Sequence, residues 1–262
     1  MTAVTFEPKP GRRPLASMAL AHAAMEARLI LRNGEQLLIA IVIPLLLLVG
    51  GAESGNVVDL GSGRRIDVLT PGVLALAVLS TSFTSLAIAT AFERRYGVLK
   101  RLGASPLPRS GLLLGKAMSV LAIEVGQLAV IAVVGLALGW RPSGGLAGAV
   151  ASVVLIVVGT AAFASLGLLL AGTVRAEAAL AAANLVYVVL LTAGAVLIPV
   201  KSYPDAMQPI VSMLPSGALA QGLRDALTGT NLGVGHVIGH VVVLTAWFAV
   251  GAVLTVRTFS WD

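Results

Sequence analysis

The chain has 262 residues, of which 57% are hydrophobic and 11% are charged, and its formal net charge is +6. Soluble domains usually carry about 25% charged residues, so this composition cannot supply the polar surface that a water-soluble fold needs. The absence of cysteine excludes disulfides, thiol catalysis and cysteine-based metal sites. The positive charge lies between apolar segments, which indicates a lipid bilayer as partner and no nucleic acid.

The N-terminal segment, residues 1–35, is expected to form a tail followed by an amphipathic helix. Residues 1–14 are polar and rich in proline. In residues 15–32, apolar side chains alternate with polar ones such as His22 and Glu26. This pattern is typical of a helix that lies on a membrane surface, and a plain soluble helix is the alternative.

Six apolar segments follow, and each is predicted to cross a bilayer core of about 30 Å, which takes about 20 residues. They are residues 36–52, 68–91, 111–139, 146–172, 177–200 and 234–256. The first one ends in LLLLVGGA like a signal peptide, but its polar leader is too long and five more spans follow. The sequence therefore predicts an all-α polytopic membrane protein, in which residues 1–262 form one transmembrane domain of six helices.

The distribution of basic residues predicts the orientation of these spans. With the N-terminus inside, the inner segments hold 13 of the 18 basic residues and the outer segments hold five. The inner set is Lys9, Arg12, Arg13, Arg28, Arg32, Arg94, Arg95, Lys100, Arg101, Arg109, Lys116, Arg175 and Arg257, and the outer set is Arg64, Arg65, Arg141, Lys201 and Arg224. Because positively charged loops stay on the cytoplasmic side, both termini are predicted to be cytoplasmic, in a bacterial inner membrane.

The loop at residues 92–110 gathers much of this charge between the second and third spans. A short helix is predicted over residues 93–102, with Tyr96, Leu99 and Leu102 along one face. A glycine ends this helix and two prolines prevent it from resuming. A short helix with an apolar edge and basic flanks suits docking into a groove on another protein, and a solvated basic loop near anionic lipid is the alternative.

The stretch ERRYGVLKRLGASPLPRSGLLLGKAM at residues 93–118 resembles the cytoplasmic loop of ABC-2 type transporter permeases. More narrowly, it is similar to the daunorubicin-resistance and antibiotic-efflux group. The matching positions are Glu93, Arg94, Gly97, Leu99, Lys100, Arg101, Leu102, Ala104, Ser105, Pro106, Leu107, Pro108, Gly115 and Lys116. Tyr96 departs from the pattern, because glutamate is common there. The amphipathic N-terminal segment is similar to the elbow helix of the family, and residues 198–227 resemble the segment before its last span.

This resemblance implies the permease subunit of an ATP-driven exporter, with no enzymatic activity of its own, that moves a hydrophobic or amphipathic drug, lipid or related metabolite out of the cell. The chain would bind no cofactor, and ATP and Mg would bind to a separate ABC ATPase subunit. A second permease copy would complete a homodimer or a paralogous heterodimer. The residues implied to dock the ATPase are Glu93, Arg94, Gly97, Leu99, Lys100, Arg101 and Leu102. Glu93 is expected to pair with a nearby basic group or with the elbow helix.

Residues 201–230 are expected to form an extracytoplasmic, re-entrant segment. Three prolines break it into short pieces, and a short helix is predicted to begin near Ser216 as its N-cap. Arg224 and Asp225 must be covered by protein, because charged groups are costly in lipid. The resemblance implies that this segment closes an outer gate.

Polar side chains inside the spans are candidates for a substrate pathway. Glu124 and Gln127 lie three residues apart in the third span, and Asn184 and Tyr187 lie three apart in the fifth, so each pair shares a helix face. Hydrogen bonding between helices is the alternative reading of all four. Glu124 also allows another function, a proton-coupled secondary transporter, although the sequence shows no internal repeat and one buried acid.

Other chemistry finds little support in the sequence. GLLLGKAM has the wrong glycine spacing for a phosphate loop, and alanine stands where serine or threonine should hold Mg²⁺. His236 and His240 lie at i and i+4, but no third ligand is near them in the sequence, so no metal site is expected.

Overall fold

The computed structural model describes residues 14–32, 34–53, 64–103, 108–230 and 233–259. Within these ranges all regular elements are helical. In chain order they are α1 (Leu15–Arg32), α2 (Gly34–Glu53), α3 (Arg65–Val78), the π-helix η2 (Leu79–Ser85), α4 (Leu86–Arg95), α5 (Val98–Gly103), α6 (Arg109–Ala137), α7 (Gly145–Thr173), α8 (Ala176–Ala193), the 3-10 helix η3 (Val200–Ser202), α9 (Gln208–Met213), α10 (Pro215–Thr228) and α11 (Val234–Thr258). The predicted all-α fold is confirmed for the described residues.

Five helices in the described part of the chain are long and apolar enough to cross a membrane. They are Arg65–Arg95, which joins α3, η2 and α4, then Gly111–Ala137, Gly145–Thr173, Ala176–Ala193 and Gly235–Thr258. In α2, which occupies the first predicted span, the shorter stretch Ala40–Glu53 is apolar. The structure is therefore that of a multi-pass membrane protein, and a sixth span stays a prediction.

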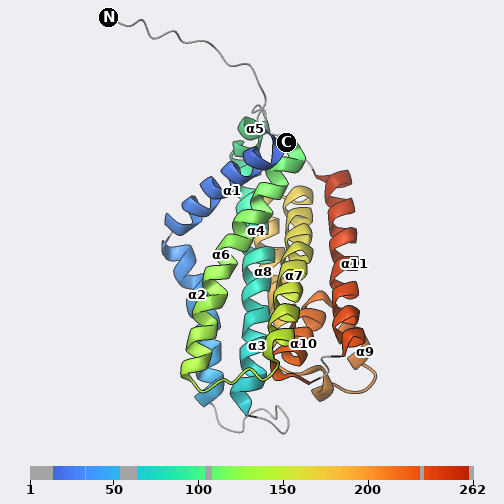
Figure 1. The fold of residues 1–262 in the computed structure, drawn as a ribbon. Coiled ribbons are helices and arrows are strands. Elements are labelled where there is room, and N and C mark those ends of the chain that lie inside the picture. Colours follow the sequence, from blue (N-terminus) through green and yellow to red (C-terminus); the bar gives the residue numbers. More distant parts are fainter. Residues whose placement is uncertain (1–13, 33, 54–63, 104–107, 231–232, 260–262) are drawn as a thin grey trace, which may run out of the picture.

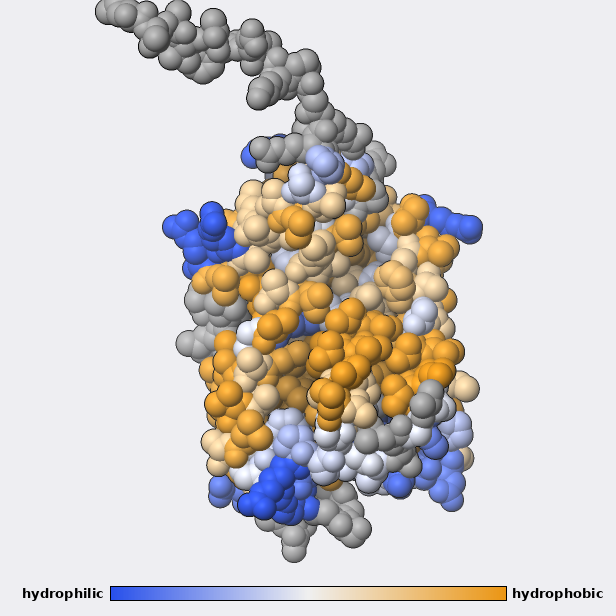
Figure 2. Space-filling model, viewed as in Figure 1, coloured by the Kyte–Doolittle hydropathy of each residue, from blue (hydrophilic) through white to orange (hydrophobic). Residues whose placement is uncertain are grey.

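The helices run side by side along one axis (Figure 1). The start of α1, all of α5 and the end of α11 lie at one end of the molecule, whereas α9, α10 and the start of α3 lie at the other. On the face shown in Figure 2, hydrophobic side chains form a band across the middle of the molecule, with hydrophilic residues towards both ends. Such a band is what a bilayer core requires of the surface of a spanning protein.

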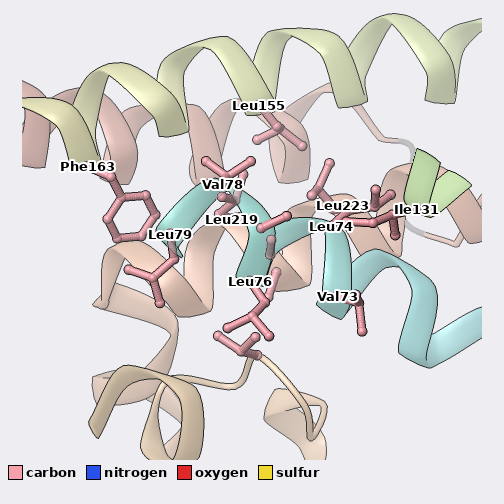
Figure 3. Close-up of a cluster of buried hydrophobic side chains, with 14 of the residues drawn as sticks. Val73, Leu74, Leu76, Val78, Leu79, Ile131, Leu155, Phe163, Leu219 and Leu223 are labelled. Atoms are coloured by element: carbon pink, nitrogen blue, oxygen red, sulfur yellow. The ribbon is translucent and has the colours of Figure 1, made fainter. Parts of the chain in front are cut away.

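The second span is the centre of the core. Leu76 and its neighbours on α3 and η2 are fully buried (Figure 3). Leu155 and Phe163 of α7 and Leu219 and Leu223 of α10 belong to the same cluster. Helices α8 and α11, by contrast, expose most of their apolar side chains. The exposed faces can be covered by lipid or by a second chain, whereas the central span is enclosed within this chain.

The fifth predicted span is shorter than expected. It was predicted over residues 177–200, but α8 ends at Ala193. Gly194 follows the helix, and Ala195 adopts a positive φ of 54° that no helix can contain. The apolar run continues past this break, which is why hydropathy alone placed the end too late.

Candidate functional site

The predicted coupling helix is interrupted. One helix was predicted over residues 93–102, but α4 continues to Arg95 and α5 begins at Val98. Gly97 lies between them with a φ of 71°, a left-handed conformation that glycine adopts without steric cost. The turn separates Glu93 and Arg94, which belong to the end of the second span, from the short helix α5.

The exposed surface of α5 differs from the predicted one. Tyr96, just before α5, is 66% exposed, Val98 is 36% exposed, and Arg101 is exposed. Leu99, however, is fully buried. The predicted contact between Leu99 and a partner therefore needs correction: because the turn at Gly97 rotates α5, this side chain anchors α5 within the chain. Leu102 is half-buried and Lys100 is exposed.

Two arginines fix the end of α4 to the turn between α7 and α8. The guanidinium of Arg94 donates to the carbonyl oxygen of Gly172 at 2.6 Å and to that of Val174. Arg95 forms an ion pair with Glu177 at the start of α8. Arginine side chains stabilise the unpaired carbonyls at a helix C-terminus in this way. Arg94 thus positions the loop, and its predicted contact with an ATPase stays a prediction.

A buried lysine connects three elements next to this loop. Lys116 of α6 is 1% exposed, and its Nζ lies 2.8 Å from Oε1 of Glu26 on α1 and 2.5 Å from Oε2 of Glu93 on α4. Of the two expected partners of Glu93, a nearby basic group or the N-terminal amphipathic helix, the structure supplies the basic group, Lys116. A lysine so deeply buried requires such partners.

A close helix contact precedes this lysine. Gly115 faces α1, and a Cβ at this position would lie 2.6 Å from Cδ2 of His22 and 3.1 Å from the carbonyl oxygen of Ala19. The glycine thus lets α1 approach α6 closely enough for Glu26 to reach Lys116. Burial lowers the pKa of His22; Glu26 partly opposes this shift and Lys116 adds to it. Burial therefore favours the neutral form of this imidazole.

Glu124 and Gln127 are buried between helices. Glu124 has no exposed surface, and its Oε2 accepts a hydrogen bond of 2.5 Å from the hydroxyl of Thr160 on α7. Gln127 accepts a bond of 2.7 Å from Thr81 on η2 and donates one of 2.7 Å to the carbonyl of Ala40 on α2. Both side chains therefore hydrogen-bond between helices, and a pathway role stays a prediction.

The other two pathway candidates do not join them. Asn184 is exposed on α8, and its amide donates to the carbonyl of Leu180 on its own helix at 3.0 Å. Tyr187 is half-buried and packs against the main core. The structure of one chain therefore places the predicted pathway residues in two separate environments.

At the end opposite α5, a buried arginine organises the segment before the last span. Arg224 of α10 is 4% exposed and donates to the carbonyl oxygens of Ala195 at 2.7 Å, Val196, and Val68 at 3.3 Å. Asp225 accepts a bond of 2.9 Å from Gln221. The predicted cover for these charges is thus provided by the chain itself.

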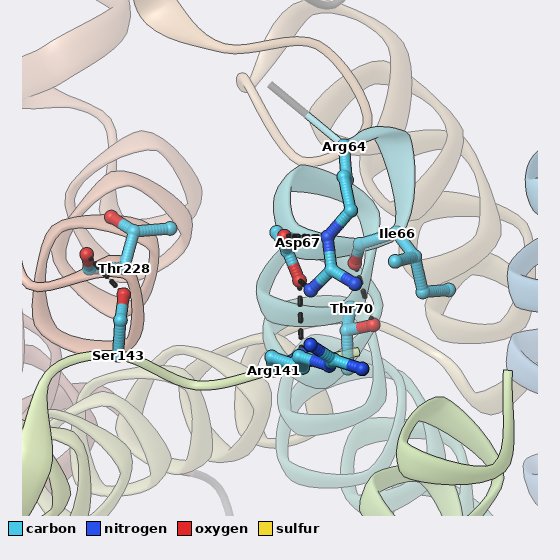
Figure 4. Close-up of polar contacts among 7 residues, drawn as sticks. All are labelled: Arg64, Ile66, Asp67, Thr70, Arg141, Ser143 and Thr228. Atoms are coloured by element: carbon cyan, nitrogen blue, oxygen red, sulfur yellow. Dashed lines mark hydrogen bonds and ion pairs between the residues drawn. The ribbon is translucent and has the colours of Figure 1, made fainter. Parts of the chain in front are cut away.

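Further polar contacts close this end of the molecule (Figure 4). The side chain of Arg64 is paired with Asp67, whose carboxylate also accepts from the backbone N–H of Arg141 at 3.0 Å. Ser143 donates to the carbonyl of Thr228 at 2.6 Å. The loop between α6 and α7 is thereby fixed to both α3 and α10.

Two details of the sequence-based site were wrong or missing. The helix predicted to begin near Ser216 begins at Pro215, with Leu214 as N-cap, because proline suits the first helical position. Glu26 was not recognised as a partner of Lys116, and its place on the polar side of the amphipathic helix was the available signal.

A sequence model of the ABC-2 type transporter family matches residues 21–228, which is more than half of the chain. The match begins within α1 and ends at the last residue of α10. No curated protein matches the chain.

Proposed function

The chain belongs to the ABC-2 type transporter family, and from this membership we propose that it is the membrane-spanning permease subunit of an ATP-driven exporter. It is a permease component and not a catalytic subunit. In this proposal a separate ABC ATPase subunit holds ATP and Mg, and this chain supplies the membrane pathway without a cofactor. Both termini and α5 face the cytoplasm of a bacterium, as the excess of basic residues on that side favours.

The observation that carries this proposal is the bracing of the end of α4, which lies directly before α5 in the chain. The end of α4 is joined to α6 and α1 through Lys116, and to the turn between α7 and α8 through Arg94 and Arg95. A displacement of α5 by a partner is therefore passed to several helices at once. A partner can shift a conformational equilibrium only if its affinity differs between the two conformations. A segment that is connected to several helices can present a different surface to the partner in each conformation.

The exposed part of α5 suits an ATPase groove. Tyr96, Val98 and Arg101 place an aromatic ring, an aliphatic group and a positive charge on one short exposed segment. Tyrosine and arginine are enriched among the residues that dominate the energy of protein interfaces. We propose that these three residues and Lys100 contact the ATPase. They replace Leu99, which the sequence analysis included among the docking residues.

The cargo that we propose is hydrophobic or amphipathic, and the resemblance of residues 93–118 to the antibiotic-efflux group favours a drug or lipid. The exposed apolar faces of α8 and α11 supply the surface that a second permease copy and the bilayer would cover. Asn184 lies on such a face, where a partner helix or a polar group of the cargo can reach it.

A proton-coupled transporter that uses Glu124 is not favoured. The carboxylate is fully buried and hydrogen-bonded to Thr160, and a single carboxylate held between two packed helices has no neighbouring acid in the described part of α6 or α7 to which a proton could pass. Interhelical hydrogen bonding accounts for this residue.

The test is transport in proteoliposomes that contain this chain together with a candidate ABC ATPase subunit. We expect efflux of a fluorescent hydrophobic drug to require MgATP and to be independent of a pH gradient. A Glu124→Gln variant is expected to keep this energy requirement. Transport driven by a pH gradient without the ATPase would contradict the proposal.

A further inference from the structure

A cavity of about 210 Å³ lies directly beside Lys116. It is lined by α1, α2, the second span and α6, and its mouth includes Leu29, which is 59% exposed, and Ala89, which is also exposed. The cavity therefore opens on the side of the molecule between the elbow helix and the second span. We propose that it binds a single-chain amphiphile with an ammonium head group.

The charge at one end of the cavity favours a cation. Glu26, Glu93 and Lys116 all line it, so two carboxyl groups and one ammonium group face this end of the cavity. Burial lowers the pKa of His22 and so favours its neutral form beside Glu26. Charges interact strongly where water is excluded, so this end attracts a second cation and repels an anionic head group.

The rest of the cavity suits a hydrocarbon chain. Its wall includes Ile30, Leu86, Val120 and Ile123. The residues that line it along the second span run from Glu93 to Thr81, which are 12 residue steps apart in η2 and α4, or at most about 18 Å at 1.5 Å per step. Pockets for drug-sized molecules measure roughly 300–1,000 Å³, so this smaller space takes one slender chain.

This inference goes beyond the proposed function, because binding in the cavity requires neither an ATPase nor transport. The ammonium group could come from an exported amphiphile or from an aminolipid of the surrounding leaflet. Both sources share the chemistry that the cavity recognises, namely a positively charged head followed by an apolar chain.

The test uses a dodecylammonium probe with a photoactivatable group in its chain, and a dodecyl sulfate probe of the same length as control. The full chain is placed in phosphatidylcholine nanodiscs, labelled, and mapped by mass spectrometry. We expect peptides of α1, α4 and α6 to take up the ammonium probe at least about fivefold more than the sulfate probe, which is the effect of one partly buried charge pair. Equal labelling by the two probes would overturn the inference.

Two variants, each with a control, test separately the part of the cavity that would hold the hydrocarbon chain and the part that would hold the ammonium group. Ala89→Trp should block the mouth and abolish labelling, whereas Ala249→Trp, a change at an equally accessible position on α11, should not. Glu26→Gln should lower labelling by the ammonium probe to the level of the sulfate probe, whereas Asp205→Asn at the opposite end should leave it unchanged. If Ala89→Trp or Glu26→Gln binds the probe like the natural chain, with an unaltered unfolding temperature, the site is not where we place it.

A final arm identifies the source of the ammonium group. Adding lysophosphatidylethanolamine, an aminolipid with one chain, to the nanodiscs should reduce labelling if an aminolipid occupies the cavity, and should leave it unchanged if a free amphiphile does. Both results place an ammonium group at this site. Because this experiment contains no ATPase, its failure would leave the proposed export function untouched.

Discussion

Lys116 is the residue that connects α1, α4 and α6 next to the loop. It is almost inaccessible to solvent, and its ammonium group lies between a carboxylate of α1 and one of α4. A buried ion pair contributes little net stability, but removal of one partner is costly because it leaves the other charge uncompensated. The neighbouring carboxylates, Glu26 and Glu93, retain some exposure, which moderates this cost.

We expect Lys116→Met to lower the free energy of unfolding by about 3 kcal/mol, near the lower limit for breaking a buried pair. The methionine fills the same space, so the loss reports on charge and not on packing. Unfolding in detergent micelles, followed by tryptophan fluorescence, measures the change. The triple variant Glu26→Gln, Lys116→Met, Glu93→Gln should recover most of it, and a triple variant as unstable as the single one would refute the charge explanation.

At this scale the sequence was a partial guide. A carboxylate next to a basic loop predicted that Glu93 would find a cation, and the structure supplies Lys116. The contribution of Glu26 was not predictable, because the distance between α1 and α6 depends on how the amphipathic helix folds back onto the spans. Leu99 was predicted to be exposed on a regular helix, and the turn at Gly97 rotates it into the protein.

Among the elements, the contact between α1 and α6 depends on a small residue. Gly115→Ala should destabilise the protein by about 1–3 kcal/mol, the usual cost of overpacking, since its Cβ would meet His22 and Ala19. Gly126 offers a matched control on the same helix, because no heavy atom lies within 4 Å of a Cβ there. Gly126→Ala should be neutral or stabilise by up to about 1 kcal/mol through helix propensity. Equal effects of the two substitutions on the unfolding temperature would argue against this packing.

Helix α10 is held in place by its arginine. Arg224→Lys keeps the positive charge but cannot reproduce the guanidinium contacts with carbonyl groups from two other segments. Each lost hydrogen bond of a charged group costs about 1.5–3 kcal/mol, so we expect a loss of at least about 2 kcal/mol in unfolding free energy. Arg141→Lys, an exposed position at the same end, should change little. A tolerated Arg224→Lys would show that α10 does not depend on these contacts.

The sequence located the elements better than their ends. Long apolar runs placed α6, α7 and α11 within a few residues, because hydropathy is averaged over many positions. The end of α8 and the break before α5 each depend on one or two residues with a left-handed backbone, Ala195 and Gly97. Such single-residue conformations are fixed by tertiary contacts or by glycine, and they leave no periodic signal.

Over the whole molecule, the elements lie at the two ends in the way that the proposed orientation in the membrane requires. The start of α1, the exposed basic segment α5 and the end of α11 share one end, and the braced segment around α10 occupies the other (Figure 1). Between them lies the apolar band of Figure 2. A partner that binds at α5 would thus push on the end of the second span, which is also the most enclosed helix of the core.

The central claim is that an ATPase subunit binds the exposed surface of α5, and co-purification tests it most directly. The variant Tyr96→Asp, Arg101→Glu changes this surface, and Ile210→Asp, Lys201→Glu changes an equally exposed surface at the opposite end. We expect the first variant to lose at least about tenfold of the co-purified ABC ATPase, since tyrosine and arginine at interfaces often contribute 2 kcal/mol or more, while the second retains it. Unchanged co-purification of the first variant, or an equal loss in both, would contradict the account.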